Sequence, residues 1–111
     1  MRAIRPIAAA LVAGVAIALP APATASLPLP VERAAAKSAE FAARLCDKDP
    51  HCVSDGVLNC DRQSPRIVLC RIFDERSTRA QGTYRCERMI RVALDAATGR
   101  APVTGIGPWH C

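Results

Sequence analysis

The chain has 111 residues, with 15 Lys or Arg against 10 Asp or Glu, and it contains six cysteines. The formal net charge of +5 includes Arg2 and Arg5, and without these two the remaining 13 basic and 10 acidic residues leave +3. A chain of this size has room for one domain, and so small a positive charge does not by itself indicate nucleic-acid binding.

The N-terminus has the pattern of an export signal. A positively charged start precedes an apolar run at residues 7–19, and the small residues Ala23-Thr24-Ala25 predict cleavage before Ser26. The run is shorter than the roughly 20 apolar residues of a membrane-spanning helix, so we expect release and no membrane span. Residues 1–25 are therefore predicted to be a signal peptide, and residues 26–111 a single secreted, extracellular, disulfide-rich domain.

One helix is predicted in the mature chain, at residues 31–45. It follows Pro30, which suits the start of a helix. Small and apolar residues fall on one side of it at helical spacing, namely Val31, Ala34, Ala35, Ser38, Phe41, Ala42 and Leu45. The alanines would let this helix lie close to a sheet. Residues 47–56 are polar and rich in turn formers, and we expect a short helical turn after Pro50.

From residue 57 the apolar pattern changes to a period of two, which is typical of strands. The predicted strands are residues 57–62, 67–74, 84–95 and 102–111. Short connections between successive strands favour an antiparallel meander in the order 1-2-3-4, with the glycine-containing last strand as a weak edge. The prediction is an α+β fold, with one N-terminal helix packed on a four-stranded antiparallel meander sheet and disulfides across it.

The cysteine positions agree with this meander. Residues that face each other in an antiparallel hairpin have a constant sum of residue numbers. The pairs Cys60 with Cys70, Cys70 with Cys86, and Cys86 with Cys111 each centre on a predicted turn. These four cysteines are therefore predicted to lie in one row across the sheet.

Six cysteines allow 15 pairings, and the row narrows the choice. A Cys70–Cys86 bridge would leave Cys60 and Cys111 on opposite margins of the sheet, too far apart to join. The preferred bridges are Cys46–Cys52, Cys60–Cys70 and Cys86–Cys111. A bridge from Cys46 to Cys111, across the helix–sheet interface, is an open alternative.

Side-chain alternation assigns the two faces of the sheet. The residues expected to face inward with the cysteines are Leu58, Val68, Ile72, Tyr84, Ile90, Val92, Leu94 and Trp109. Arg88 also falls on this face, where we expect it either to stack on the indole of Trp109 or to extend to the sheet edge.

No catalytic, cofactor or metal site is predicted. An even number of cysteines in an exported chain indicates disulfides and not a thiolate nucleophile. Cys46, His51, Cys52 and Cys60 lack the paired spacing of a zinc site, and residues 47–56 lack the ligands of a calcium loop. We therefore expect a protein that is not an enzyme and needs no cofactor.

The outward face of the predicted sheet combines apolar residues with arginines, which is typical of recognition surfaces. The candidate binding face consists of Leu69, Arg71, Phe73, Arg85, Met89 and Arg91, with Glu87 among them. An ordinary solvated face is the simpler interpretation. The expected partners are a protein, a second copy of the chain or an anionic cell-envelope polymer. Nucleic acid is not expected, because the face has few aromatic groups for stacking.

These features predict a secreted, non-enzymatic binding domain that docks a protein or acts like an inhibitor. The alternative is a cationic envelope-associated or antimicrobial protein that acts through its Arg-rich surface. The sequence does not specify the ligand, the partner or the oligomeric state.

Short motifs around the cysteines resemble those of a known group of proteins. The Ala-rich helix, Cys60-x-Arg62, Val68-x-Cys70, Tyr84-x-Cys86 and the terminal Trp109-x-Cys111 resemble small secreted six-cysteine proteins of actinobacteria with no assigned activity. This resemblance implies secretion and disulfides. The outline of one helix on a four-stranded meander is also similar to cystatin-type protease inhibitors, although residues 81–85 do not match their Gln-x-Val-x-Gly loop.

Overall fold

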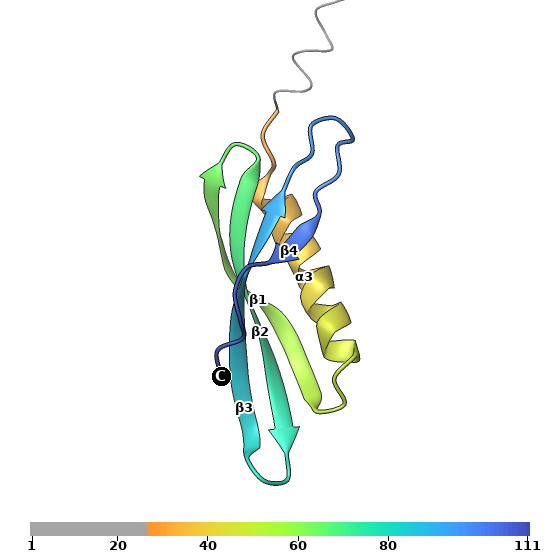
Figure 1. The fold of residues 1–111 in the computed structure, drawn as a ribbon, viewed down its shortest axis with the longest axis vertical. Coiled ribbons are helices and arrows are strands. Elements are labelled where there is room, and N and C mark those ends of the chain that lie inside the picture. The colour runs from red at the N-terminus through yellow and green to blue at the C-terminus, as the bar shows by residue number, and fades with distance from the viewer. Residues whose placement is uncertain (1–26) are drawn as a thin grey trace, which may run out of the picture.

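The structure is a computed structural model that describes residues 27–111, so the predicted signal peptide and the cleavage site before Ser26 lie outside the described residues. The elements are α3 (Val31–Asp47), β1 (Cys52–Ser64), β2 (Ile67–Thr78), β3 (Gly82–Ala93) and β4 (Val103–Gly105). The strands form one antiparallel sheet in the order β1-β2-β3-β4. Helix α3 lies along one side of this sheet (Figure 1). The predicted α+β meander is confirmed.

The small residues of α3 explain how closely it packs on the sheet. Ala34, Ser38 and Ala42 are its buried residues. The hydroxyl of Ser38 donates a hydrogen bond of 2.8 Å to the carbonyl of Ala34, so this polar group is satisfied inside the core. The helix contacts mainly β1 and β2. Its predicted inward side is therefore confirmed.

The segment before the helix is anchored on the turn between β1 and β2. Leu29 is fully buried, and its N–H donates a hydrogen bond of 2.8 Å to the carbonyl of Pro65. The Arg62 side chain donates to the carbonyl of Leu29. These contacts hold the start of α3 against one end of the sheet.

The first two strands are longer than the sequence pattern predicted, and the third begins two residues earlier and has the predicted length. β1 begins at Cys52, directly after a turn in which the Cys52 N–H donates to the Asp49 carbonyl at 3.0 Å, so the expected helical turn after Pro50 is wrong. Thr78 pairs with Gly82, which leaves a three-residue turn where the sequence predicted a long loop. Pairing with a neighbouring strand overrides the polar composition of these segments.

The predicted last strand, residues 102–111, is mostly irregular. Only Val103–Gly105 forms a strand against β3. Gly107 then adopts a φ of 112°, in the region that favours glycine. The chain rejoins the sheet at His110, whose backbone exchanges two hydrogen bonds of 2.8 Å with Glu87. The glycines and Pro108 interrupt the ladder, as expected for a weak edge.

All six cysteines are paired, and the preferred connectivity is confirmed. The bridges are Cys46–Cys52, Cys60–Cys70 and Cys86–Cys111, with Cα–Cα distances of 5.3, 4.0 and 4.0 Å. The predicted row of four cysteines is wrong, however. Cys70 faces Ile90, and Cys86 faces Asp74, because the turn after β2 is centred on Ala80, two residues later in the chain than predicted.

The core lies between α3 and the inward face of the sheet. Val68, Ile72, Ile90 and Val92 are fully buried there, while Leu94 and Trp109 are partly buried against them. Tyr84 is half-buried. The inward assignment of Leu58 is wrong, since it is 38% exposed. The register shifts between Val57 and Asn59, which is a bulge that directs Val57 to the core instead.

Candidate binding face

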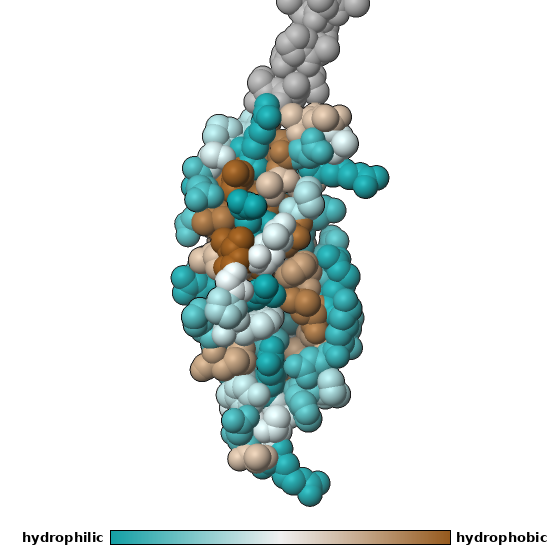
Figure 2. Space-filling view, viewed as in Figure 1, coloured by the Kyte–Doolittle hydropathy of each residue, from teal (hydrophilic) through white to brown (hydrophobic). Residues whose placement is uncertain are grey.

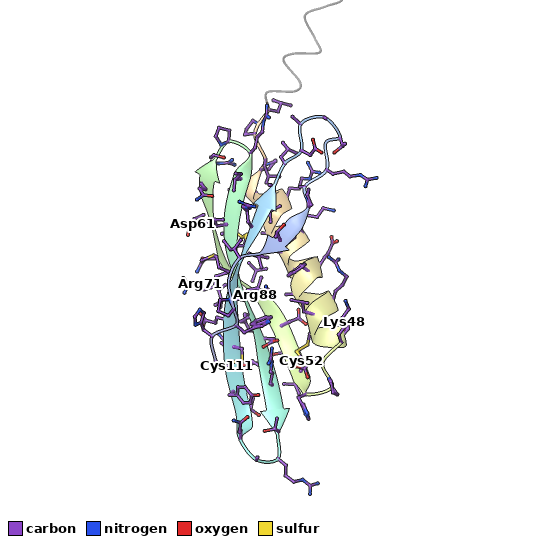
Figure 3. All side chains as sticks on the ribbon, viewed as in Figure 1. Lys48, Cys52, Asp61, Arg71, Arg88 and Cys111 are labelled. Carbon is purple, nitrogen blue, oxygen red and sulfur yellow. A yellow bond between two sulfur atoms is a disulfide. The ribbon has the colours of Figure 1, made fainter. Side chains whose placement is uncertain are left out.

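The structure brings the six predicted binding-face residues together on one side of the sheet. Leu69 pairs with Arg91 and Arg71 with Met89, while Phe73 lies opposite Glu87 in the same β2–β3 register. The residues between them on β2 are buried under α3. Because strand side chains alternate, the candidate binding face points away from the helix. Arg71 projects from this side in Figure 3, opposite the side on which Lys48 ends the helix.

The ring of Phe73 is held in place from two sides. Phe73 faces Gly56 on β1, where a Cβ atom would lie only 2.8 Å from its Cε1 atom. On the other side, the Arg85 guanidinium carbon lies 4.2 Å from the ring centroid, which is close enough for a cation–π interaction. The ring is therefore half-buried between a glycine and an arginine. The sequence analysis did not identify Gly56, although a glycine beside an aromatic residue on the next strand is a known arrangement in sheets.

Most charges on the candidate binding face are paired. Arg71 lies 3.6 Å from Glu87, and Arg85 lies 3.6 Å from Glu75. Glu75 also accepts a hydrogen bond of 2.6 Å from the hydroxyl of Ser54. Exposed pairs of this kind contribute little stability, so their main effect is to order the side chains and to leave the face nearly neutral.

A hollow of about 270 Å³ adjoins the face where β3 meets the C-terminal segment. Met89 and Arg71 contribute from the face, and His110 contributes from the segment that pairs with Glu87. Arg88 reaches the same hollow from the sheet edge, where its Nε donates a hydrogen bond of 2.8 Å to the Gly107 carbonyl. The predicted stacking of Arg88 on Trp109 is wrong, and the alternative position at the sheet edge is confirmed.

Arg76 is the residue that stacks on Trp109, with 5.3 Å between its guanidinium carbon and the ring centroid. It also lies 3.1 Å from Asp74, whose side chain is nearly buried, and 3.5 Å from Asp49. Hydrogen bonding to Asp74 holds the pKa of the Arg76 guanidinium above its ordinary value, so this residue stays charged. The cluster joins β2, the turn after α3 and the C-terminal segment.

The remaining exposed apolar residues are dispersed. Leu27 and Val53 are each 61% exposed, while Leu58 is 38% and Ile106 is 37% exposed. On the side seen in Figure 2, hydrophobic residues form separate small groups between hydrophilic ones. Scattered residues of this kind are normal on a protein surface. The feature that distinguishes the candidate binding face is therefore its fixed aromatic ring beside a hollow, and not its total apolar area.

Within residues 27–111, no three His, Cys, Asp or Glu side chains gather as metal ligands would. No helix in this part of the chain has the length and apolar character needed to cross a membrane. The chain matches no protein-family model, and no curated protein sequence or solved structure is significantly similar to it.

Proposed function

We propose that the protein is exported and acts without catalysis, as a domain that docks a partner protein on the candidate binding face. The export pattern at residues 1–25 supports secretion. The three disulfides support it further, because such bridges persist in oxidising compartments outside the cytosol.

The observation that carries the docking proposal is the fixed ring of Phe73 beside the hollow at Met89. Rigid aromatic groups next to small pockets are the usual centres of binding energy in protein interfaces. Pockets for whole small molecules usually measure roughly 300–1,000 Å³, and this hollow of about 270 Å³ lies at the lower limit of that range. Its size suits one side chain of a protein partner, and Met89 is the apolar part of a lining that also includes Arg71, Glu87, Arg88 and His110.

The paired charges favour the same interpretation. Glu87 and Glu75 neutralise Arg71 and Arg85, so the face offers shape and apolar area more than net charge. Arg91 is exposed and has no ion-pair partner within residues 27–111. The partner that fits best inserts one side chain into the hollow and places an acidic residue near Arg91. Inhibitor-like binding is one form of such docking.

The proposal is tested by capturing partners from the medium into which the protein is exported. The immobilised mature protein is compared with Met89→Asp and Leu69→Asp, which add a charge to the face. Ala39→Asp makes the same change at an exposed position on α3 and serves as the matched control. We expect one protein to be retained at 1 M salt by the wild type and the control, and to be lost by both face variants.

Circular dichroism and a non-reducing peptide map show whether the variants keep their fold and bridges. A partner that both face variants still capture would refute docking on this face. Release of all captured material by 1 M salt would support the alternative of a cationic envelope-associated or antimicrobial protein, because salt screens exposed charges. That alternative rests on the net charge of +3 and is weakened by the ion pairs of the face.

A further inference from the structure

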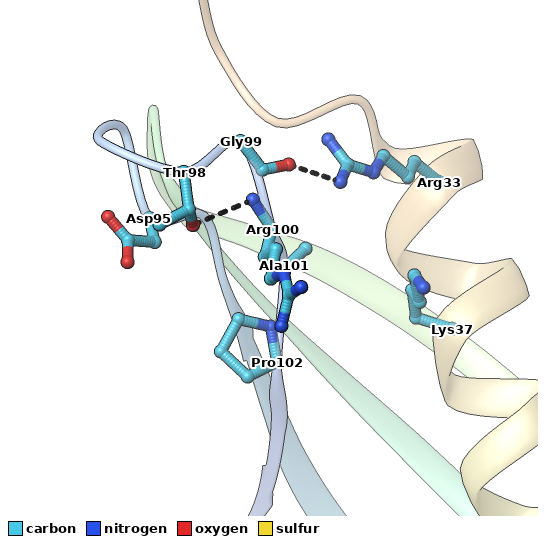
Figure 4. Close-up of a pocket in the computed structure, with 8 residues that line it drawn as sticks. All are labelled: Arg33, Lys37, Asp95, Thr98, Gly99, Arg100, Ala101 and Pro102. Carbon is cyan, nitrogen blue, oxygen red and sulfur yellow. Dashed lines mark hydrogen bonds between the residues drawn. The ribbon is translucent and has the colours of Figure 1, made fainter.

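A second surface feature lies on the helix side of the sheet, away from the candidate binding face. It is an open cleft of about 960 Å³ between α3 and the segment that joins β3 to β4 (Figure 4). Arg33 and Lys37 form one wall and lie one helical turn apart, so they project in the same direction. Arg100 and Pro102 belong to the opposite wall.

The loop that forms the second wall is well anchored. The Asp95 N–H donates to the Arg100 carbonyl at 2.7 Å, and the Gly99 N–H donates to the Asp95 carbonyl at 2.7 Å. Gly99 has a φ of 75°, which favours glycine. Arg33 then bridges the cleft, with its Nη2 atom donating a hydrogen bond of 2.6 Å to the Gly99 carbonyl. Because the loop is tied to the helix, the cleft is formed before any ligand arrives.

Positive charge is concentrated in this cleft. It contains Arg33, Lys37 and Arg100 against the single carboxylate of Asp95. This excess of two positive charges accounts for most of the net charge of +3 that remains without Arg2 and Arg5. The side chains of Lys37 and Arg100 have no ion-pair partner within the described residues 27–111. Like charges held on facing walls repel each other, and a bound anion would relieve that repulsion.

The cleft also contains hydrogen-bond acceptors. Asp95 uses one carboxylate oxygen to accept the Ala97 N–H at 2.9 Å, and its second oxygen is available at the side of the loop that lies away from Lys37 (Figure 4). The hydroxyl of Thr98 accepts the Arg100 N–H at 3.2 Å and can still donate. Cations on the helix side of the loop, with a hydroxyl and a carboxylate further along it, match an extended ligand that has both negative groups and hydroxyl groups. A polyphosphate offers only acceptors, which Asp95 would repel.

We infer that the cleft between α3 and the β3–β4 loop binds an anionic saccharide, a sugar chain that carries carboxylates. Lys37, Arg100 and the remaining N–H groups of Arg33 bind the carboxylates. Asp95 and Thr98 bind the sugar hydroxyls. This site is separate from the face proposed for protein docking and uses none of its residues.

The test is a titration of the mature protein with an oligogalacturonate of about six sugar units. Binding is measured from the changes in the positions of the backbone amide NMR signals. We expect the shifted signals to come from residues 33–37 and 95–102. Maltohexaose, which has no charge, is expected to bind at least about ten-fold more weakly, because it cannot form the charge-assisted hydrogen bonds. Inorganic polyphosphate is expected to bind more weakly than oligogalacturonate.

The variant Lys37→Gln/Arg100→Gln is expected to lower the affinity for oligogalacturonate about ten-fold or more. Lys48→Gln/Arg79→Gln removes the same charge at exposed positions outside the cleft and should change the affinity less than about two-fold. Met89→Asp, which tests protein docking, should leave saccharide binding unchanged. Equal losses in the two charge variants would overturn the inference. Signals shifting elsewhere, or polyphosphate binding as tightly as oligogalacturonate, would overturn it as well.

Discussion

Gly56 and Phe73 face each other across β1 and β2, and the phenyl ring occupies the space that a side chain at residue 56 would fill. A Cβ atom at this glycine would lie 2.8 Å from Cε1 of the ring. The backbone of Gly56 is not in the positive-φ region, so the glycine is required by the ring and not by the conformation of the strand. This contact determines where the aromatic group of the candidate binding face lies.

The effect of Gly56→Ala should therefore change sign with the residue at position 73. In the wild type it displaces the ring from its contact with Arg85 and should lower the free energy of unfolding by about 1 kcal/mol. In a Phe73→Ala background the space is empty. There, Gly56→Ala should raise the free energy of unfolding by about 0.5 kcal/mol, because it reduces the backbone entropy of the unfolded chain. Urea unfolding measures both values. The same sign in both backgrounds would contradict the contact.

Removing Arg76 alone should destabilise the protein more than replacing both Asp74 and Arg76 by apolar residues. Arg76→Leu leaves the nearly buried Asp74 without its partner and should cost about 3 kcal/mol of stability. The double variant Asp74→Leu/Arg76→Leu should recover most of this loss, because no unpaired charge is left buried. Arg79→Leu, at an exposed turn position, is the control and should have little effect. A double variant as unstable as Arg76→Leu alone would show that the pair is not the cause.

The contribution of each disulfide to the free energy of unfolding should depend on the length of the loop that it closes. Cys86 and Cys111 are separated by 25 residues in sequence, and Cys46 and Cys52 by 6. Replacing the first pair by alanines should cost about 1 kcal/mol more than replacing the second, since longer loops constrain the unfolded chain more. Chemical denaturation compares the two variants.

Fluorescence provides a second readout for the same variants, because Trp109 is the only tryptophan of the chain. Loss of the Cys86–Cys111 bridge frees the C-terminal segment and should shift the Trp109 emission to the red. Loss of the Cys46–Cys52 bridge should not. An unchanged emission in both variants would mean that stacking on Arg76 and the pairing of His110 hold the segment without the bridge.

Export should remove residues 1–25. N-terminal sequencing of the protein from the medium is expected to begin at Ser26, because signal peptidase recognises the small residues at positions 23 and 25. Substitution of Ala23 and Ala25 by leucine should cause the precursor to accumulate. A secreted protein that keeps its apolar N-terminal run would contradict the predicted cleavage.

The faces of the sheet could be predicted from the sequence even though one register was wrong. The predicted second hairpin placed Cys86 opposite Cys70, whereas the structure places Ile90 there. This is a shift of four residues, and an even shift returns every side chain to the same face. The residues of β2 and β3 that share the outward face were therefore predicted correctly, although their cross-strand partners were not.

The pairing of Cys60 with Cys70 could also be predicted from the sequence, because a tight turn keeps the residues on either side of it close together. Cys60 and Cys70 flank the tight turn at Pro65 and Arg66, and they still face each other after the register shift between Arg62 and Ser64. The bulge at Leu58 was not predictable in this way, since nothing in the alternation of that segment marks an extra residue. Its consequence is that Val57, and not Leu58, packs on the core.

The sequence by itself determined the fold class, the helix and the division of the sheet into two faces, because these follow from periodicity and spacing along a short stretch of chain. It favoured the bridges that the structure shows, and the structure decided between them and the alternative from Cys46 to Cys111. Only the tertiary structure decided which distant polar groups meet. Arg76 stacks on Trp109 while Arg88 turns to Gly107, and Arg33 reaches Gly99 across the helix–loop cleft. These contacts depend on the turn lengths, bulges and strand ends that bring separate elements together, and periodicity along the chain does not encode them.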